Sequence, residues 1–245
     1  MFSFKSLSLF ILLTTVFSPV NSHAEDADFI SEGGRLYDKW WQEIGLKKPA
    51  TTHPSYPSAG RQKGANTWRC KECHGWDYLG DKGAYASGSH FTGIRGISDS
   101  AGRSIDEVMA ILKNKTHRYD EVMLDYGLLR LSAFVSSGQV DIRHYFRPDS
   151  NKVIGNILNG KKRYNQSCKE CHGSQGLKRN FGSRNKPEYM GTLANKNPWE
   201  AMHKLRNGHP DAFVMGDPMP HMLGKINLQQ QLDLLAYLQT LPPAK

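Results

Sequence analysis

The chain has 245 residues, four cysteines and a formal net charge of +9 at neutral pH. Beyond residue 24, no segment is long and apolar enough to cross a bilayer as a helix, which argues against an integral membrane protein. No recognisable nucleic-acid-binding module accompanies the positive charge, so the charge does not indicate a nucleic-acid-binding protein.

The first residues have the pattern of a secretory signal peptide. Lys5 supplies a positive charge, residues 7–16 are apolar, and residues 22–24 (Ser-His-Ala) form a small-x-small cleavage site. The alternative, an uncleaved anchor, is disfavoured because the apolar stretch is shorter than the roughly 20 residues that a spanning helix needs. We therefore expect a signal peptide at residues 1–24 and a mature protein in the periplasm.

Two copies of one sequence plan follow. Each copy begins with a helical Gly-x-x-x-Tyr segment, Gly33 to Tyr37 in the first and Gly160 to Tyr164 in the second. The glycine permits close approach of two crossed helices, and the aromatic ring packs across the crossing. Each copy continues with a C-x-x-C-H pentapeptide, a glycine-rich stretch, an amphipathic helix and a closing helix. This repetition predicts two helical domains rather than one larger fold.

Local signals predict where the later helices begin and end. Ser104 and Glu107 form a capping box at the start of one helix. Asn197 can cap a second helix, which has a proline in its first turn and ends at Gly208. The closing helices of the two copies are expected at residues 128–135 and 228–241.

The first copy carries an insertion that the second copy lacks. Tyr164 precedes Cys168 by only a few residues, whereas a stretch rich in proline, glycine, threonine and lysine separates Tyr37 from Cys70. We expect a long surface loop there that wraps the domain. A cover over the edge of a bound cofactor and a contact with a partner are the alternatives.

All four cysteines lie in the two C-x-x-C-H pentapeptides, residues 70–74 and 168–172. Two thiols at this spacing can form thioethers with the vinyl groups of a porphyrin, and the adjacent histidine can bind the iron. A zinc ribbon is disfavoured, because its cysteine pairs lie about 15–20 residues apart and these start 98 positions apart. A thioredoxin-like motif would need a βαβ pattern, which is not visible, and structural disulfides need no histidine. The pentapeptides predict two covalently bound haem c groups, attached through Cys70, Cys73, Cys168 and Cys171, with His74 and His172 as iron ligands.

On these residues the chain resembles dihaem c-type cytochromes built from two cytochrome c class I domains. Besides the pentapeptides, the resemblance is carried by Gly160 and Tyr164, by Met219-Pro220 and by residues 234–238 (Leu-Leu-Ala-Tyr-Leu). It implies an all-α fold of two tandem haem domains, in which crossed terminal helices enclose most of each porphyrin. The expected boundaries are residues 25–140 for the first domain, 141–152 for a linker and 153–245 for the second domain.

The resemblance also implies where the second axial ligands of the two irons lie. In the second domain, the family's usual methionine position implies Met219, and Met215 and Met222 in the same loop are alternatives. In the first domain, Phe134 corresponds to Tyr237, and His117 stands 17 residues before Phe134. This spacing predicts bis-histidine ligation by His74 and His117, with Met123 as the main alternative and His90 as a further one. The other histidines are expected on the surface or in hydrogen bonds: His53, His144, His203, His209 and His221.

The leading functional prediction is a periplasmic electron carrier, or the cytochrome subunit of a respiratory oxidoreductase. Outside the haem sites no nucleophile–base pair, metal cluster or nucleotide-binding loop is recognisable, so electron transfer is favoured over catalysis. Residues 151–245 carry 14 basic and 6 acidic side chains, which fits either acidic redox partners or a solubilising surface. The alternative is a dihaem oxidoreductase that acts on a small sulfur or nitrogen oxyanion or on a peroxide.

Overall fold

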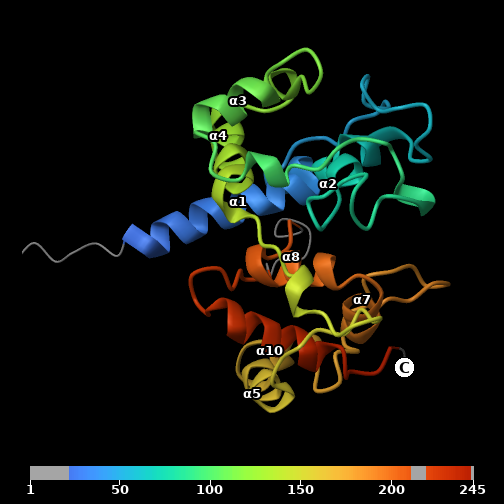
Figure 1. Ribbon diagram of the computed structural model, residues 1–245, viewed down its shortest axis with the longest axis vertical. Coiled ribbons are helices and arrows are strands. Elements are labelled where there is room, and N and C mark those ends of the chain that lie inside the picture. Colours follow the sequence, from blue (N-terminus) through green and yellow to red (C-terminus); the bar gives the residue numbers. More distant parts are fainter. Residues whose placement is uncertain (1–21, 211–218, 244–245) are drawn as a thin grey trace, which may run out of the picture.

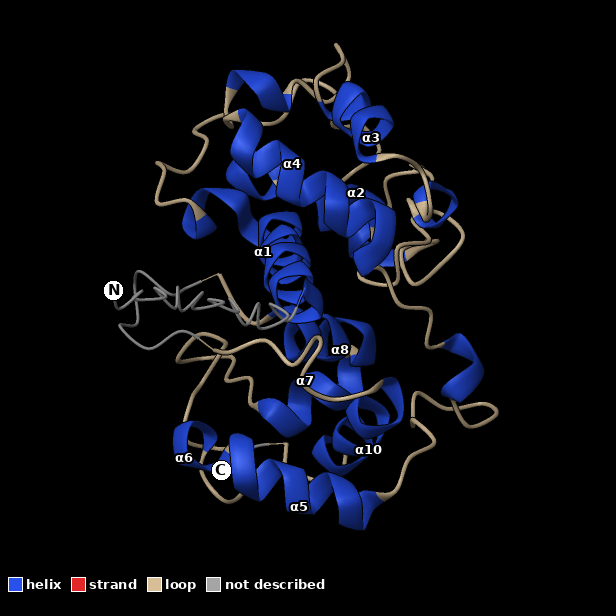
Figure 2. Ribbon diagram, turned by 90° about the vertical axis from the view of Figure 1, so that its left-hand side faces the viewer, coloured by secondary structure: helices blue, strands red, loops and turns tan. Residues whose placement is uncertain are grey.

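The computed structural model describes residues 22–210 and 219–243, which fold into two helical halves (Figures 1 and 2). In this part of the chain no strand forms, and only isolated β-bridges such as that between Gly80 and Arg95 occur. The predicted all-α class is therefore confirmed. Most of the predicted signal peptide, residues 1–21, lies outside the described residues, as does Met215.

The described α-helices fall into two groups along the chain. The N-terminal half contains α1 (Ser22–Glu43), α2 (Cys70–His74), α3 (Ile105–Leu112) and α4 (Asp125–Ala133), which continues in a π-helical turn at Phe134–Gly138. The C-terminal half contains α5 (Ile157–Ser167), α6 (Lys169–His172), α7 (Met190–Lys196), α8 (Pro198–Asn207) and α10 (Leu228–Leu238). None of the described helices has the length and apolar character required to span a membrane.

The predicted helix caps are present. The hydroxyl of Ser104 accepts the backbone N–H of Glu107, whose carboxylate accepts the N–H of Ser104, so the capping box at α3 is confirmed. The side chain of Asn197 accepts the N–H of Glu200 at the start of α8. Gly208 ends α8 with a φ of +82°, a backbone conformation that residues other than glycine rarely adopt.

The closing helices differ by one turn from their predicted bounds. Helix α4 starts at Asp125 instead of residue 128 because its first turn, with Asp125 and Tyr126, is exposed and gives no apolar signal. Helix α10 ends at Leu238 instead of residue 241. There the N–H of Thr240 turns to the carbonyl of Tyr237, which tightens the chain into a turn.

Each half is organised around one crossing of its first and last helices. A Cβ on Gly33 of α1 would lie 2.0 Å from the carbonyl oxygen of Arg130 in α4. A Cβ on Gly160 of α5 would lie 2.0 Å from the carbonyl oxygen of Asp233 in α10. Side chains cannot occupy such distances, so both glycines are required by close backbone contact, as the sequence predicted.

Two separate clusters of buried apolar side chains stabilise the halves. The fully buried members of the first cluster come from α1, α4 and the π-helical turn: Leu36, Tyr37, Trp40, Leu128, Leu131 and Phe134. Those of the second come mainly from α5, α8 and α10: Ile142, Tyr164, Met202, Leu232 and Leu235. Ile142 belongs to the segment predicted as a linker, so that segment packs into the core of the C-terminal half.

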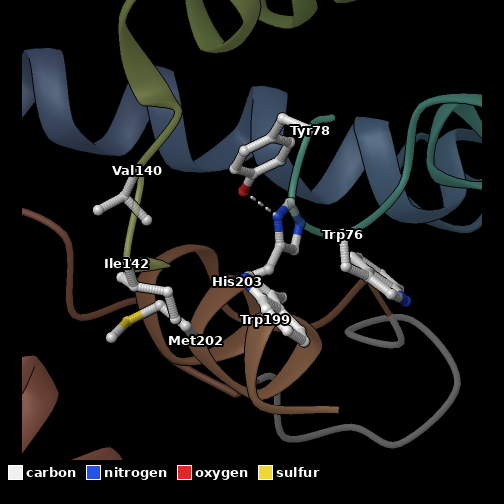
Figure 3. Close-up of a pocket in the computed structure, with 7 residues that line it drawn as sticks. All are labelled: Trp76, Tyr78, Val140, Ile142, Trp199, Met202 and His203. Carbon is white, nitrogen blue, oxygen red and sulfur yellow. Dashed lines mark hydrogen bonds between the residues drawn. The ribbon is translucent and has the colours of Figure 1, made fainter. Parts of the chain in front are cut away.

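The halves meet where α1 lies against α8, between the two cores (Figures 1 and 2). His203 of α8 is 1% exposed, and its Nε2 donates to the carbonyl of Gly34 in α1 at 2.9 Å. Because Nε2 carries the proton, Nδ1 accepts, and it receives the hydroxyl of Tyr78 at 2.9 Å (Figure 3). His203 is thus a buried hydrogen-bonding residue that joins the halves, and it is not at the surface.

Charged groups of both halves are also buried at this contact. Asp38 of α1 is 1% exposed, accepts from Lys204 of α8 at 2.9 Å and pairs with Arg69 of its own half. Burial alone would raise the pKa of Asp38, but Lys204 and Arg69 hold it well below its usual range. The indole ring of Trp76 lies between two ammonium groups, those of Lys71 at 5.4 Å and Lys204 at 5.3 Å from its centroid.

Replacing Gly160 with Ala should destabilise the protein, because the added Cβ collides with the backbone of Asp233. We expect the free energy of unfolding to fall by about 2 kcal/mol or more, measured by denaturant titration with circular dichroism. The control is Asn165→Ala on the exposed face of α5, expected to change it by less than about 0.5 kcal/mol. Equal losses in the two variants would contradict the close crossing.

The stability of the contact between the halves should fall in acid. Burial lowers the pKa of His203 to about 4, so the neutral ring favours folding above pH 6.5 and this contribution is lost as the pH falls toward 4. The shift of the His203 pKa from 6.5 to about 4 corresponds to a loss of about 3 kcal/mol in the free energy of unfolding once the ring is protonated. Unfolding measured between pH 7 and pH 4 should show a steeper loss for the wild type than for His203→Gln. Parallel pH profiles for the two proteins would show that His203 does not carry this effect.

Candidate functional site

A cavity of about 390 Å³ lies beside α2 in the N-terminal half. Its lining includes Cys70, Cys73, His74 and His117, so the fold brings together four of the predicted site residues. The volume lies in the range of about 300–1,000 Å³ that is usual for ligand and cofactor sites. Aliphatic side chains from α3, α4 and the π-helical turn form an apolar wall: Val108, Ile111, Leu112, Leu131 and Val135.

His74 at the end of α2 is held in one orientation. Its Nδ1 lies 2.8 Å from the carbonyl oxygen of Arg95, so Nδ1 carries the proton and donates. That bond leaves Nε2 as the nitrogen able to bind a metal. Burial lowers the pKa of His74 to about 4, which keeps the imidazole neutral at physiological pH, as metal binding requires.

His117 faces the same cavity from the loop between α3 and α4. The ring centroids of His74 and His117 lie 6.3 Å apart. The ring planes are inclined by 27°, and both rings face the same cavity. The two imidazoles are thus close enough for one metal ion to bind both.

The alternatives to His117 have other contacts. Met123 is 4% exposed and packs against α4, where a Cβ on Gly127 would approach its sulfur to 2.7 Å. His90 has its Nδ1 2.8 Å from the carboxylate of Glu72, and its ring stacks on Tyr85 at 4.8 Å. These contacts give both residues a structural role beside α2 or α4.

A tyrosine hydroxyl fixes the turn that follows each pentapeptide. Gly75 has a φ of +78°, and its carbonyl accepts the hydroxyl of Tyr37 at 2.6 Å. Gly173 has a φ of +81°, and its carbonyl accepts the hydroxyl of Tyr164 at 2.5 Å. The Gly-x-x-x-Tyr segments and the pentapeptides, which the sequence showed as separate motifs, are thus parts of one repeated arrangement.

The cysteines are available for covalent attachment. The described residues include all four, and no disulfide joins any of them. Burial raises the pKa of Cys70 to about 11, of Cys73 to about 12 and of Cys168 to about 11, so these thiols are neutral. Cys70 and Cys73 both line the apolar cavity, next to His74.

The insertion of the N-terminal half folds back over the cavity. The indole N–H of Trp68 donates to the carbonyl of Thr51 at 2.9 Å, which ties the insertion to the segment before α2. His53 and Ser55 line the cavity. The insertion is therefore a wrap that also covers part of the site, which combines two of the roles considered from the sequence.

In the C-terminal half, His172 occupies the position that matches His74. Its side chain is buried, and its Nδ1 has no hydrogen-bond partner among the described residues. Burial lowers the pKa of His172 to about 4, so the ring is neutral. A buried nitrogen without a partner costs free energy, and this imidazole is in the form that a metal binds. Phe181 packs on the ring edge to face, at 5.9 Å.

The methionine loop of this half runs past the end of α8. Met219 is partly buried, and a Cβ on Gly208 would lie 2.5 Å from its carbonyl oxygen. The N–H of Met222 donates to the carbonyl of Leu205 at 3.0 Å, and its side chain packs on the core of the half. The next residue after Pro220, His221, pairs with Asp28 of α1 at 2.5 Å, so the N-terminal half contacts this loop.

Sequence reasoning did not place His53 at the site. It is 8% exposed and lines the cavity beside His117, 64 positions away along the chain. No periodicity or motif marks a histidine in a proline-rich loop. The only available signal was the insertion itself, for which a role as a cover was considered.

Comparison with known proteins finds a similarity for the C-terminal half of the chain. A family model described as Cytochrome c matches residues 157–242. Neither the curated proteins nor the solved structures gave a match. The matched range starts at α5 and includes the pentapeptide at residues 168–172 and Met219. Residues 157–242 are therefore similar to a cytochrome c domain, a module of electron-transfer proteins, and Cys168, Cys171 and His172 within this range are the residues that would hold a covalently bound haem c.

Proposed function

We propose that the protein is a periplasmic dihaem c-type cytochrome that carries electrons between redox partners, alone or as the cytochrome subunit of an oxidoreductase. The observation that carries the proposal is the repetition, in both halves, of one set of contacts around a C-x-x-C-H pentapeptide. When bound, two haem c groups would supply the one-electron chemistry. The signal-peptide pattern at residues 1–24 supports the periplasmic location.

Three features support a haem domain at residues 25–140, outside the range that the family model matches. The crossing at Gly33 repeats the crossing at Gly160. The bond from Tyr37 to Gly75 repeats the bond from Tyr164 to Gly173. The cavity beside α2 has apolar walls and is lined by Cys70, Cys73 and His74 of the pentapeptide. The glycine crossing and the bond from tyrosine to glycine are thus present in both halves.

Different ligand pairs would hold the two irons. In the N-terminal half, we propose His74 and His117, with Met123 as the alternative to His117. In the C-terminal half, we propose His172 and Met219, with Met215 and Met222 as alternatives. A methionine ligand raises the potential of a haem relative to a second histidine, so the C-terminal half would have the higher potential. This difference favours electron flow from the N-terminal to the C-terminal half.

The exposed side chains on the outer face of the C-terminal half favour binding to another protein. Lysines at positions 161, 162, 169 and 178 are exposed on and after α5, close in sequence to the pentapeptide. Leu158, which is 77% exposed, adds an apolar side chain to this face. A basic face with an apolar contact point attracts acidic protein surfaces and speeds association. We therefore propose acidic redox partners for this half.

Mass spectrometry of the denatured protein tests the number of haem groups. We expect the mass of the mature polypeptide plus two haem groups, because thioether bonds survive denaturation. Replacing both cysteines of either pentapeptide with Ala should remove one group and leave the other. A purified protein that carries a single group, or that releases its pigment on acid extraction, would contradict the proposal.

Magnetic circular dichroism of the oxidised protein tests the ligand pairs. Met219→Ala should remove the methionine-to-iron charge-transfer band, and His117→Ala should remove the bis-histidine band, since each change deletes one axial ligand. His144→Ala, an exposed histidine, is the control and should leave both bands unchanged. A methionine band that persists without Met219 would move the assignment to Met215 or Met222. A bis-histidine band that persists without His117 would exclude His117 as a ligand.

A further inference from the structure

The loop that carries His117 satisfies the backbone N–H groups of residues 116–118 from within, but it leaves the carbonyls of Thr116 and His117 without a partner in the loop. The side-chain oxygen of Asn114 accepts the N–H groups of Thr116 and His117 at 2.9 and 3.0 Å. The backbone carbonyl of Asn114 accepts the N–H of Arg118 at 2.8 Å. Arg118 then takes a left-handed conformation, with a φ of +55°, and the chain turns sharply. The carbonyls of Thr116 and His117 are left to find partners outside the loop.

The insertion supplies both partners. The hydroxyl of Ser55 donates to the carbonyl of Thr116 at 2.7 Å. The Nε2 of His53 lies 3.0 Å from the carbonyl oxygen of His117. Two successive carbonyls of the ligand loop are therefore bound by two side chains of residues 51–55, which we call the strap. The strap and the loop are more than 60 positions apart in the sequence.

The ring of His53 is itself fixed in one tautomer and one place. Its Nδ1 accepts the backbone N–H of Ser55 at 3.1 Å, so the proton resides on Nε2 and is donated to His117. The ring packs edge to face on Trp68, with centroids 4.4 Å apart. The backbone N–H of His53 donates to the hydroxyl of Thr67 at 2.8 Å. Both ring nitrogens are committed to backbone groups, so His53 is placed to support the loop rather than to bind a metal.

We propose that His53 is a positioning residue for His117: it fixes the backbone of His117 through its carbonyl, while the side-chain oxygen of Asn114 lies 3.3 Å from Nδ1 of the ring itself. The proposal rests on the proposed function, because it takes His117 as the second axial ligand of the first iron. His53 does not touch the reacting atoms. It holds the backbone from which the ligand projects, and Trp68 and Thr67 hold His53 in turn. Outer partners of this kind commonly tune the affinity of a ligand for its metal.

The test uses the full-length holoprotein and three variants: His53→Ala, His53→Gln and His144→Ala. The readouts are the bis-histidine band in magnetic circular dichroism and the rate at which cyanide binds. Loss of one hydrogen bond to a buried carbonyl should release His117 more often, so His53→Ala should bind cyanide about tenfold faster. It should also show a weaker bis-histidine band. His53→Gln keeps an N–H donor on a side chain of similar length and should recover most of the wild-type behaviour. His144→Ala should match the wild type.

The outcomes separate the inference from the proposed function. If His117→Ala abolishes the bis-histidine band while His53→Ala and His53→Gln both behave like His144→Ala, the positioning role is overturned and the ligand assignment stands. If His117→Ala leaves the band intact, the ligand assignment fails. If His53→Ala and His53→Gln both abolish the band completely, His53 is a ligand and the inference is overturned. Should His53→Ala not fold, His53→Leu decides, since leucine fills the space of the ring but has no N–H donor: the inference expects this variant to bind cyanide faster, and wild-type behaviour would overturn it.

Discussion

One hydrogen bond organises each half of this protein: a tyrosine of the first helix donates to the carbonyl of the glycine that follows the pentapeptide histidine. Tyr37 and Tyr164 each sit one helical turn after a glycine that lies against a closing helix. The crossing of the helices fixes the tyrosine, the tyrosine fixes the glycine turn, and the turn fixes the histidine before it. The position of each pentapeptide histidine therefore depends on a backbone contact of the glycine that lies one turn before the tyrosine on the first helix of its half.

The proposed second ligand of each half depends on chain segments that are remote in sequence. The His117 loop is held by the strap, and the loop that contains Met219 is contacted by α1 through Asp28 and His221. The residues proposed to attach the haem groups thus come from a short local motif. The loops proposed to carry the second ligands are held in place by tertiary contacts. This division explains why a match to a family model can be confined to residues 157–242 although both halves share the same crossing. The insertion before Cys70 interrupts the sequence pattern and leaves the helices in place.

The parts of the structure that were predictable are those encoded by neighbouring residues. The capping box at Ser104, the cap at Asn197 and the close crossings at Gly33 and Gly160 were readable because their chemistry is local or because only glycine fits. His53 and His203 were not placed, since their partners lie 64 and more than 120 positions away. A histidine has no periodic signature that separates an exposed ring from a buried one. Only the fold shows which carbonyl it faces.

The buried charges between α1 and α8 have a consequence for how the molecule can be divided. Asp38 belongs to the N-terminal half, but one of the two cations that neutralise it, Lys204, belongs to the other half. Trp76 is likewise flanked by ammonium groups from both halves. A cut in the segment 147–152 would leave each helix crossing intact, but it would separate Ile142 from the core of the C-terminal half and expose Asp38 and Trp76. We therefore expect neither half to be stable as a separate fragment, because the interface between them buries charged groups that neutralise each other.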